Sequence, residues 1–288
     1  MIDILELISN IKPLDRGAIN EARYHFDNLI KPKGSLAKLE DMVCLYIGAT
    51  GETDPVKLEY PKKVISLWAS EQDRTFLDKT YLGREPLNFL AKKAKSEVFI
   101  TELICRQDDS AAENMIDALL KGIDTTEKNI KSNGYQLFSV AIPGRYALPV
   151  EWNSIKSEEP YTILQHFGDV RLAAAVGAIL TSAYLRTPIM LDGLASVLAC
   201  FIAAKIAPLS LEYCIASNIT TEEGQEGLIK ELALSAVLRL QISQGQGEGT
   251  SLAFTLFDAG IRAYKEMETF AQAGVHSELE EFSVSKNN

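Results

Sequence analysis

Five short apolar runs, separated by stretches with helical patterning, constrain the fold of this chain more than any other feature of its sequence. Each run has the length of a buried strand rather than that of a helix. Strands that alternate with helices are typical of a parallel sheet. The sequence therefore predicts an α/β fold: a parallel sheet with helices on both faces, plus a small helical subdomain from the N-terminal segment. The predicted strands are 64–68, 98–100, 137–142, 189–191 and 213–216.

Helical patterning begins near the N-terminus, where 15–29 and 36–47 are predicted to form two amphipathic helices. Ser110 and Glu113 match a capping box, which starts a further helix. Gly134 is expected to stop that helix.

Three later helices are predicted from the second half of the chain. The stretch 169–185 is rich in alanine and apolar residues, so we expect a helix that is buried and closely packed. The stretches 225–240 and 251–269 also have helical patterning. These helices would cover the predicted sheet.

The predicted domain boundaries follow the order of the sequence. Residues 1–50 are expected to form an N-terminal helical segment that packs on the main domain. Residues 60–275 would form the α/β domain, and 276–288 a frayed tail. A length of 288 residues is compatible with one α/β domain that carries a small appendage.

The charge balance argues against nucleic acid as a partner. The chain holds 29 Lys and Arg against 39 Asp and Glu, a formal net charge of −10, and the basic residues are scattered. A protein that binds a phosphate backbone usually gathers its cations on one face. We expect no nucleic-acid partner.

The four cysteines suggest neither a disulfide framework nor a metal site. They are far apart, with no Cys-x-x-Cys pair and no histidine at ligand spacing. We expect buried thiols in a reducing cytosol, no metal and no cofactor. The longest apolar stretch, 195–204, is far shorter than a membrane span, so the protein is expected to be cytoplasmic, with no membrane partner.

Two glycine-containing loops are the places where chemistry is expected. Asp192 and Gly193 follow a predicted strand directly, and ligands of parallel sheets bind at the carboxyl ends of strands. The alternative for Asp192 is simple capping of the next helix. The second loop, 245–250, holds Glu248 among three glycines. A glutamate kept from water there has a raised pKa, which suits a general base, whereas the alternative is a surface turn into a helix.

Several segments along nearly the whole chain, taken together, resemble the nicotinate-nucleotide:5,6-dimethylbenzimidazole phosphoribosyltransferase family. They occur in the family's order, and the loop of Glu248 is one of them. The segments are Pro13-Leu14-Asp15, Lys31-Pro32 with Gly34-Ser35-Leu36 and Leu39-Glu40, Phe167-Gly168-Asp169, Arg186-Thr187-Pro188 to Leu191-Asp192-Gly193, Gly247-Glu248-Gly249-Thr250, and Thr269-Phe270 to Ala273-Gly274-Val275.

The resemblance implies transfer of the 5-phosphoribosyl group from nicotinate mononucleotide to a lower-ligand base used in cobamide assembly. Glu248 would be the general base that takes the proton of the incoming azole or phenol. Backbone amides at Gly168 and Gly193 would hold the phosphate. The resemblance implies substrate contacts at Gly168, Asp192, Gly193, Gly247, Gly249, Thr250 and Arg145.

The chain departs from the family's pattern at three places. The family's Ala-x-Asp-His-Gly motif is replaced by 69–73, with the sequence Ala-Ser-Glu-Gln-Asp. Its glycine-rich loop with a glutamate falls at 139–145, where the glutamate and most glycines are missing. A Ser-His pair is replaced by Ser217-Asn218. Arg145 beside Pro143 either holds a phosphate in an altered way or blocks the nucleotide pocket; we favour blockage, because proline also removes an amide donor.

Three readings remain open from the sequence. Members of the family are usually homodimers, and anaerobes that attach phenolic lower ligands use a heterodimer, so this chain is interpreted as the partly degenerate subunit beside an active paralogue. The second reading is an independently active, divergent transferase that uses Glu248. The third is a non-enzymatic sensor of a nucleotide or base. The acceptor is a benzimidazole, a purine or a phenol.

Overall fold

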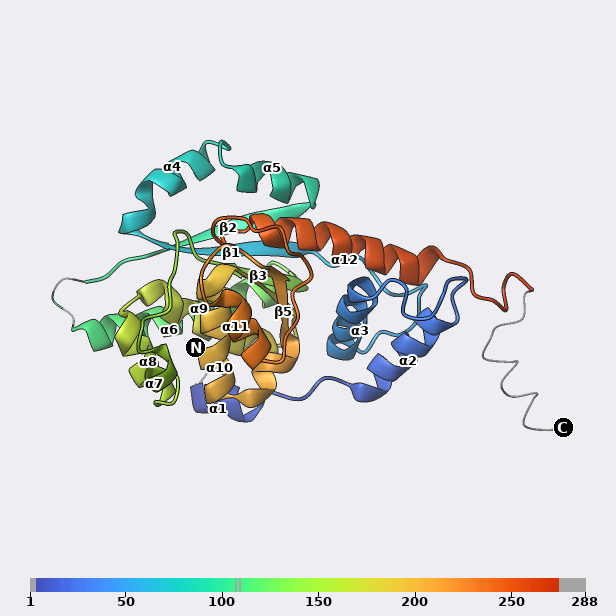
Figure 1. Ribbon diagram of the computed structural model, residues 1–288, viewed down its shortest axis with the longest axis horizontal. Helices are drawn as coiled ribbons and strands as arrows, with labels where there is room; N and C mark the ends of the chain where they lie inside the picture. The colour runs from blue at the N-terminus through green and yellow to red at the C-terminus, as the bar shows by residue number, and fades with distance from the viewer. Residues whose placement is uncertain (1–3, 107, 109, 275–288) are drawn as a thin grey trace. The chain divides into compact units, whose positions relative to one another are not determined.

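The computed structural model describes residues 4–106, 108 and 110–274, and its centre is a five-stranded sheet (Figure 1). The strand order is β2-β1-β3-β4-β5, and each neighbouring pair is parallel, which confirms the predicted α/β class. All five predicted strands are present. They are β1 (Lys63–Ser70), β2 (Ser96–Leu103), β3 (Leu137–Ala141), β4 (Ile189–Asp192) and β5 (Cys214–Asn218).

Helices connect the strands, so each parallel pair is joined by a crossover. Figure 1 shows α4 and α5 on one side of the sheet and α6, α9 and α10 on the other. The helices are α1 (Ile4–Ser9), α2 (Arg16–Asp27), α3 (Lys38–Thr50), α4 (Arg74–Tyr81), α5 (Pro86–Lys93), α6 (Ala111–Lys131), α7 (Trp152–Ile155), α8 (Pro160–Phe167), α9 (Val170–Tyr184), α10 (Gly193–Ile206), α11 (Gln225–Glu231) and α12 (Glu248–Glu266), with 3-10 turns η1 (Glu71–Asp73) and η2 (Pro208–Tyr213).

The chain forms two compact units, and each is made of two separate stretches. Unit 1 consists of Met1–Pro13 and Pro61–Thr255 and contains the sheet. Unit 2 consists of Leu14–Tyr60 and Leu256–Asn288. The boundaries predicted from the sequence, 1–50 and 60–275, remain a prediction, and the predicted tail at 276–288 lies outside the described residues.

The core of unit 1 lies between the sheet and helices α9 and α10. Strand β3 is buried along its whole length, and α9 is buried from Val170 to Ala183, which explains why its sequence is apolar on every side. Helices α6 and α9 approach closely: a Cβ added at Gly122 would lie 2.0 Å from the carbonyl oxygen of Ala174. The expected close packing of this helix is therefore confirmed.

Local signals at helix starts agree with the structure. The Ser110 hydroxyl accepts the Glu113 amide, and the Glu113 carboxylate accepts the Ser110 amide at 2.8 Å, so the capping box is confirmed. Asp169 caps α9 by accepting the Arg171 amide at 2.9 Å.

Two expectations are wrong. The helix predicted at 225–240 ends at Glu231, because Ala233 has a left-handed backbone and Leu238 then bridges to Asn218 of β5 in parallel register. Of the cysteines, which were all expected to be buried, Cys105 is exposed. It follows the edge strand β2, where nothing covers it among the described residues.

Unit 2 gives a structural role to its Lys-Pro…Leu-Glu segment. The Lys31 ammonium pairs with the fully buried Glu40 carboxylate at 2.8 Å. The same carboxylate oxygen accepts the Leu36 amide at 3.1 Å, which closes the turn before α3. A buried charge needs such partners, so these residues hold the turn together.

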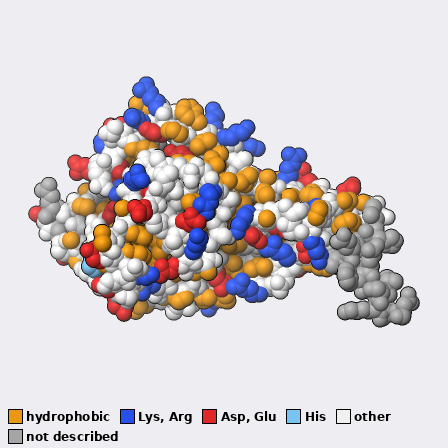
Figure 2. All heavy atoms as spheres, viewed as in Figure 1, with side chains coloured by type: hydrophobic (Ala, Val, Ile, Leu, Met, Phe, Trp, Pro, Cys, Tyr) orange, Lys and Arg blue, Asp and Glu red, His pale blue; other side chains and the backbone are white. Residues whose placement is uncertain are grey.

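The charged side chains are mixed over the surface. On the face drawn in Figure 2, Lys and Arg lie among Asp and Glu rather than in one patch. Among the described residues, no helix has the length and apolar character that crossing a membrane requires.

The close contact between α6 and α9 predicts that adding a single methyl group at Gly122 destabilises the fold. Gly122→Ala should lower the free energy of unfolding by about 1–3 kcal/mol, because the new Cβ meets backbone that cannot move aside. Urea unfolding measures this change. Gly227→Ala is the matched control: it lies in α11 with open space around it, so it should stabilise by up to about 1 kcal/mol. Equal effects of the two variants would contradict the packing argument.

Candidate active site

The two loops expected to carry chemistry meet at the carboxyl ends of β4 and β5. Asp192 is the last residue of β4, and its Oδ2 accepts the Gly247 amide at 2.8 Å and the Thr250 amide at 3.4 Å. The carboxylate makes no bond to the amides of α10, so the simple capping alternative for Asp192 is wrong. Asp192 instead fixes the loop that carries Glu248.

Glycine is required where these loops touch. A Cβ added at Gly245 would lie 2.2 Å from the Asp192 carbonyl oxygen, and one at Gly193 would lie 2.6 Å from Gly245 Cα. A Cβ at Gly249 would lie 2.5 Å from Asp192 Oδ1. Side chains at these positions would push the Glu248 loop away from the strand ends.

Glu248 begins α12 and is 8% exposed. Burial, and then the charge of Asp192, raise the pKa of its carboxyl to about 7, although backbone amides act in the opposite direction. Its Oε2 is buried without a hydrogen-bond partner in the described part of the chain. A carboxyl with a pKa near neutrality and an unused oxygen has the properties of a general base.

Asp192 is also perturbed, being 1% exposed. Burial raises the pKa of its carboxyl to about 6, against the lowering effect of the Thr250 and Gly247 amides and the Ser217 hydroxyl. The nearby Glu222 raises the Asp192 pKa further. Neighbouring buried carboxylates with raised pKa values are more frequent at functional sites than elsewhere.

Sequence reasoning missed Glu222. Its Oε2 accepts the Leu194 amide at 2.8 Å and the Thr220 hydroxyl at 2.9 Å, and its Oε1 accepts the Tyr146 amide at 2.9 Å. It thereby links the start of α10 to the segment after β3. The available signal was an acidic residue shortly after the carboxyl end of β5.

Sequence reasoning also missed Arg171, whose side chain is 7% exposed. Its Nη1 donates to both Asp73 oxygens at 2.9 Å and to the Pro143 carbonyl at 3.0 Å. Its Nη2 donates to Asp169 at 2.7 Å and to the Tyr146 hydroxyl at 3.3 Å. Three loops at the carboxyl edge are therefore tied to one guanidinium.

The charges of this cluster support one another. Burial alone would lower the pKa of Arg171. The Asp169 carboxylate, with Tyr146 and Asp73, nevertheless holds this pKa above its ordinary value. Burial raises the pKa of the Asp169 carboxyl, whereas Arg171 lowers it. The pKa of Asp169 lies below its ordinary value as a result. Arg171 and Asp169 therefore form an ion pair in which each group favours the charged form of the other.

Arg145 and Gly168 lie apart from Glu248. Arg145 is exposed, and its Nη2 donates to the Thr221 carbonyl at 3.4 Å. Gly168 ends α8 in a left-handed conformation, with its amide bonded to Leu164. Both line a cavity of about 420 Å³ above the Arg171 cluster, which Glu248 does not line.

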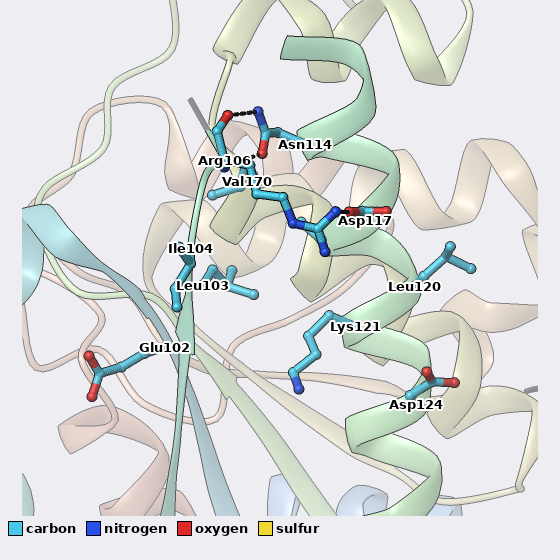
Figure 3. A pocket seen from close by; sticks show the side chains of 11 residues that line it. Glu102, Leu103, Ile104, Arg106, Asn114, Asp117, Leu120, Lys121, Asp124 and Val170 are labelled. Carbon is cyan, nitrogen blue, oxygen red and sulfur yellow. Dashed lines mark hydrogen bonds and ion pairs between the residues drawn. The ribbon is translucent and has the colours of Figure 1, made fainter. Parts of the chain in front are cut away.

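A second groove, of about 480 Å³, lies between the end of β2 and α6 (Figure 3). Arg106 pairs there with Asp117 at 3.3 Å, and its backbone carbonyl accepts the Asn114 side chain at 3.1 Å. Arg106, Asn114 and Asp117 thus engage one another. Across residues 4–106, 108 and 110–274, no cluster of His, Cys, Asp and Glu could hold a metal ion.

The family model that matches the chain is DBI_PRT, described as a phosphoribosyltransferase, over residues 11–134 and 145–275. The unmatched interval, 135–144, contains β3 and the start of the altered loop.

Similar curated proteins carry the name nicotinate-nucleotide–dimethylbenzimidazole phosphoribosyltransferase. The one from Halalkalibacterium halodurans is 25% identical over 360 aligned residues, covering 99% of this chain and 100% of the relative. The one from Clostridium acetobutylicum is 26% identical, covering 95% and 98%. Since 360 aligned residues exceed the 288 of this chain, the relative carries segments that this chain lacks.

A crystal structure of the enzyme so named from Thermus thermophilus resembles the fold. Its TM-score is 0.78 at 20% identity, covering 92% of this chain and 100% of the other. A second structure from the same organism, titled CobT, has a TM-score of 0.75 at 21% identity, covering 90% and 99%.

The raised pKa of Glu248 predicts how stability depends on pH. Because the folded-state pKa of about 7 exceeds the ordinary 4.5, this group stabilises the fold below pH 4.5, and that stabilisation is lost as the pH rises through 7. Glu248→Gln should therefore gain up to about 3 kcal/mol relative to the unmodified chain between pH 5 and pH 8. Urea unfolding at both pH values tests this, with Glu151→Gln, an exposed change of the same kind, as control. Parallel pH profiles for Glu248→Gln and the unmodified chain would refute a buried, perturbed carboxyl.

The Arg171 cluster predicts a strong effect of removing one cation. Arg171→Met should destabilise by about 3–5 kcal/mol, because it leaves the buried carboxylates of Asp73 and Asp169 without their cation. Arg239→Met, which breaks an exposed pair with Glu226, should cost less than about 1 kcal/mol. Denaturant unfolding compares the two, and similar costs would mean that the Arg171 network is not a structural tie.

Proposed function

We propose, since this chain belongs to the nicotinate-nucleotide–dimethylbenzimidazole phosphoribosyltransferase family, that it serves the transfer of a 5-phosphoribosyl group from nicotinate mononucleotide to a cobamide lower-ligand base. It does so as the partly degenerate subunit of a heterodimer whose other subunit is an active paralogue. The products are an α-linked ribotide and nicotinate.

The chemistry assigned to the site is a displacement at the anomeric carbon. A nitrogen of the azole, or the oxygen of a phenol, forms a bond to C1 of the ribosyl group. The C1–N bond to nicotinate breaks, and nicotinate leaves with the bonding electrons. In the heterodimer a base of the paralogue accepts the proton that the azole or phenol loses. In an independently active enzyme Glu248 would accept it, and its pKa of about 7 supports this role.

Substrate contacts are proposed at the loops around that base. Gly193, Gly247, Gly249 and Thr250 lie within the contact network of Asp192. Gly168 and Arg145 belong to the neighbouring cavity. These residues would contact the base and the ribosyl group, and none of them is proposed as a proton acceptor.

One observation carries the proposal of a degenerate subunit: the segment after β3 is rebuilt. The Pro143 nitrogen has no N–H to offer, and its carbonyl is held by Arg171 at 3.0 Å. Tyr146 is held by both Asp169 and Glu222. A loop tied down in this way is unlike a glycine-rich loop that encloses a nucleotide.

A second candidate is favoured by the site of Glu248 itself. Its burial, its raised pKa and its unused oxygen are features that an active transferase needs. An independently active enzyme would therefore use the same base. A sensor that binds without turnover is the remaining outcome.

Release of nicotinate from nicotinate mononucleotide tests the proposal, with benzimidazole and phenol as acceptors. We expect no release with the chain alone and release when its paralogue is added. That activity should survive Glu248→Gln in this chain, because the paralogue supplies the working base. Glu151→Gln, an exposed change of the same kind, is the control for handling and folding.

The other outcomes each assign a different function. Turnover by the chain alone that falls at least a hundredfold in Glu248→Gln establishes the independent enzyme. Binding of nucleotide or base without turnover, with or without the paralogue, establishes the sensor. Either result overturns the heterodimer proposal.

A further inference from the structure

The outer side of β2 has no partner strand. β2 stands at one end of the strand order, and its eight residues pair with β1 alone, in unbroken parallel register. Among the described residues no isolated bridge reaches it either. A strand at the edge of a sheet presents a row of free N–H and C=O groups, which can pair with an extended strand of another chain. β2 thus offers backbone hydrogen bonds to a second strand.

The side chains of β2 are less buried than those of the strand beside it. Val98, Phe99 and Ile100 are only half-buried, although they point alternately to the two faces of the sheet. Their partners in β1, residues 65–67, are fully buried. Since the two strands are neighbours in one sheet, the open side of β2 accounts for the difference.

β2 lacks the features that usually protect an edge. Natural sheets keep such strands short, bulged, interrupted by proline or marked by free charges. β2 has eight residues, no proline and no shift of register against β1. Its two carboxylates are engaged within the chain: Glu97 accepts the Tyr135 hydroxyl at 2.6 Å, and Glu102 accepts that of Tyr81 at 2.8 Å. The edge is therefore long, regular and open to pairing.

Exposed apolar side chains lie beside the same strand. Phe89 is on α5, which leads into β2, and Ile116 is on α6, on the other side of the sheet; both are exposed (Figure 1). Ile104 follows the last residue of β2, is 87% exposed and lines the groove between β2 and α6 (Figure 3). A partner at this edge would meet apolar surface as well as free backbone groups.

The two ends of β2 carry opposite charges. Three exposed lysines stand just before the strand, and within the described part of the chain no ion pair engages them: Lys92, Lys93 and Lys95. At the other end Glu102 meets Arg74, which also pairs with Asp78, so two carboxylates share one cation. When two copies of a strand pair antiparallel, the beginning of one lies beside the end of the other. Opposite charges then meet twice.

We infer that two copies of this chain pair through the outer sides of their β2 strands, antiparallel and about a two-fold axis perpendicular to the sheet. The sheet of each copy continues into that of the other. The axis keeps α4 and α5 of both copies on one side of the joined sheet, so the lysines of one copy face the carboxylates around Glu102 of the other. The occupant is a second copy because the two ends of β2 complement each other in charge.

The pairing does not rest on the proposed function. It uses the lateral edge of the sheet, whereas Asp192 lies at the carboxyl end of β4, two strands away from β2 and β1. A second copy at β2 and a paralogue at the carboxyl ends of the strands would therefore occupy different surfaces. With the paralogue present, the assembly would hold two copies of each subunit.

Analytical ultracentrifugation of the full chain, from about 1 to 100 µM, measures the pairing. We expect an equilibrium between monomer and dimer that salt shifts toward the monomer, because salt screens exposed charges. Hydrogen exchange over the same range locates the contact: amides within Ser96–Leu103 should become protected as the dimer forms. A chain that stays monomeric overturns the inference, and so does a dimer that gives these amides no added protection.

A charge-reversed variant tests the complementarity of the two ends. Lys92→Glu combined with Lys93→Glu changes exposed positions and should raise the dissociation constant of the dimer roughly tenfold or more. Lys12→Glu combined with Lys230→Glu, also exposed but near the β5 end of the sheet, is the matched control and should leave that constant unchanged.

A second variant keeps the test decisive if the first does not fold, as judged by circular dichroism. Ile104→Lys replaces an exposed apolar side chain at the end of β2 and sets a further cation opposite the lysines of the other copy. It should weaken the dimer in the same way. A folded variant of either kind that dimerises as tightly as the unmodified chain overturns the inference.

Discussion

The hydrogen bonds between the Asp192 carboxylate and the amides of Gly247 and Thr250 are the interaction on which the site depends. They join the end of a central strand to the segment that begins α12. Because the contact replaces water around Asp192 with only two amides and a hydroxyl, its carboxyl stays difficult to ionise. The charge that remains then raises the pKa of Glu248. Asp192 thus fixes the position of Glu248 and adds to the effect of burial, which is the larger cause of its raised pKa.

Much of the fold was predictable because its signals are local. Runs of apolar residues, the Ser110–Glu113 box and Asp169 ahead of an alanine-rich helix each act within a few residues. The second half of the helix expected at 225–240 is absent, because this part of the chain pairs with β5 instead. Leu238 forms a parallel bridge with Asn218. Helical propensity is a weak preference that such pairing overrides.

The candidate site was predictable only in part. Asp192 and Glu248 stand beside glycines at strand and helix ends, so the sequence marks them. Arg171 and Glu222 carry no such mark. In the sequence Arg171 is a single charged residue within an apolar helix. Its partner Asp73 lies far away in sequence. Interactions of this kind become visible only when the strand order brings the loops together.

The division of unit 2 between the two ends of the chain has a consequence for biosynthesis. Its first stretch, Leu14–Tyr60, leaves the ribosome long before Leu256 and the residues after it. Domains form as their chain emerges, so α2 and α3 must wait through the synthesis of the whole sheet for the second half of α12. During that interval the apolar faces of α2 and α3 lack their final neighbours. Unit 2 can therefore complete its packing only after the strands of the sheet have been synthesised.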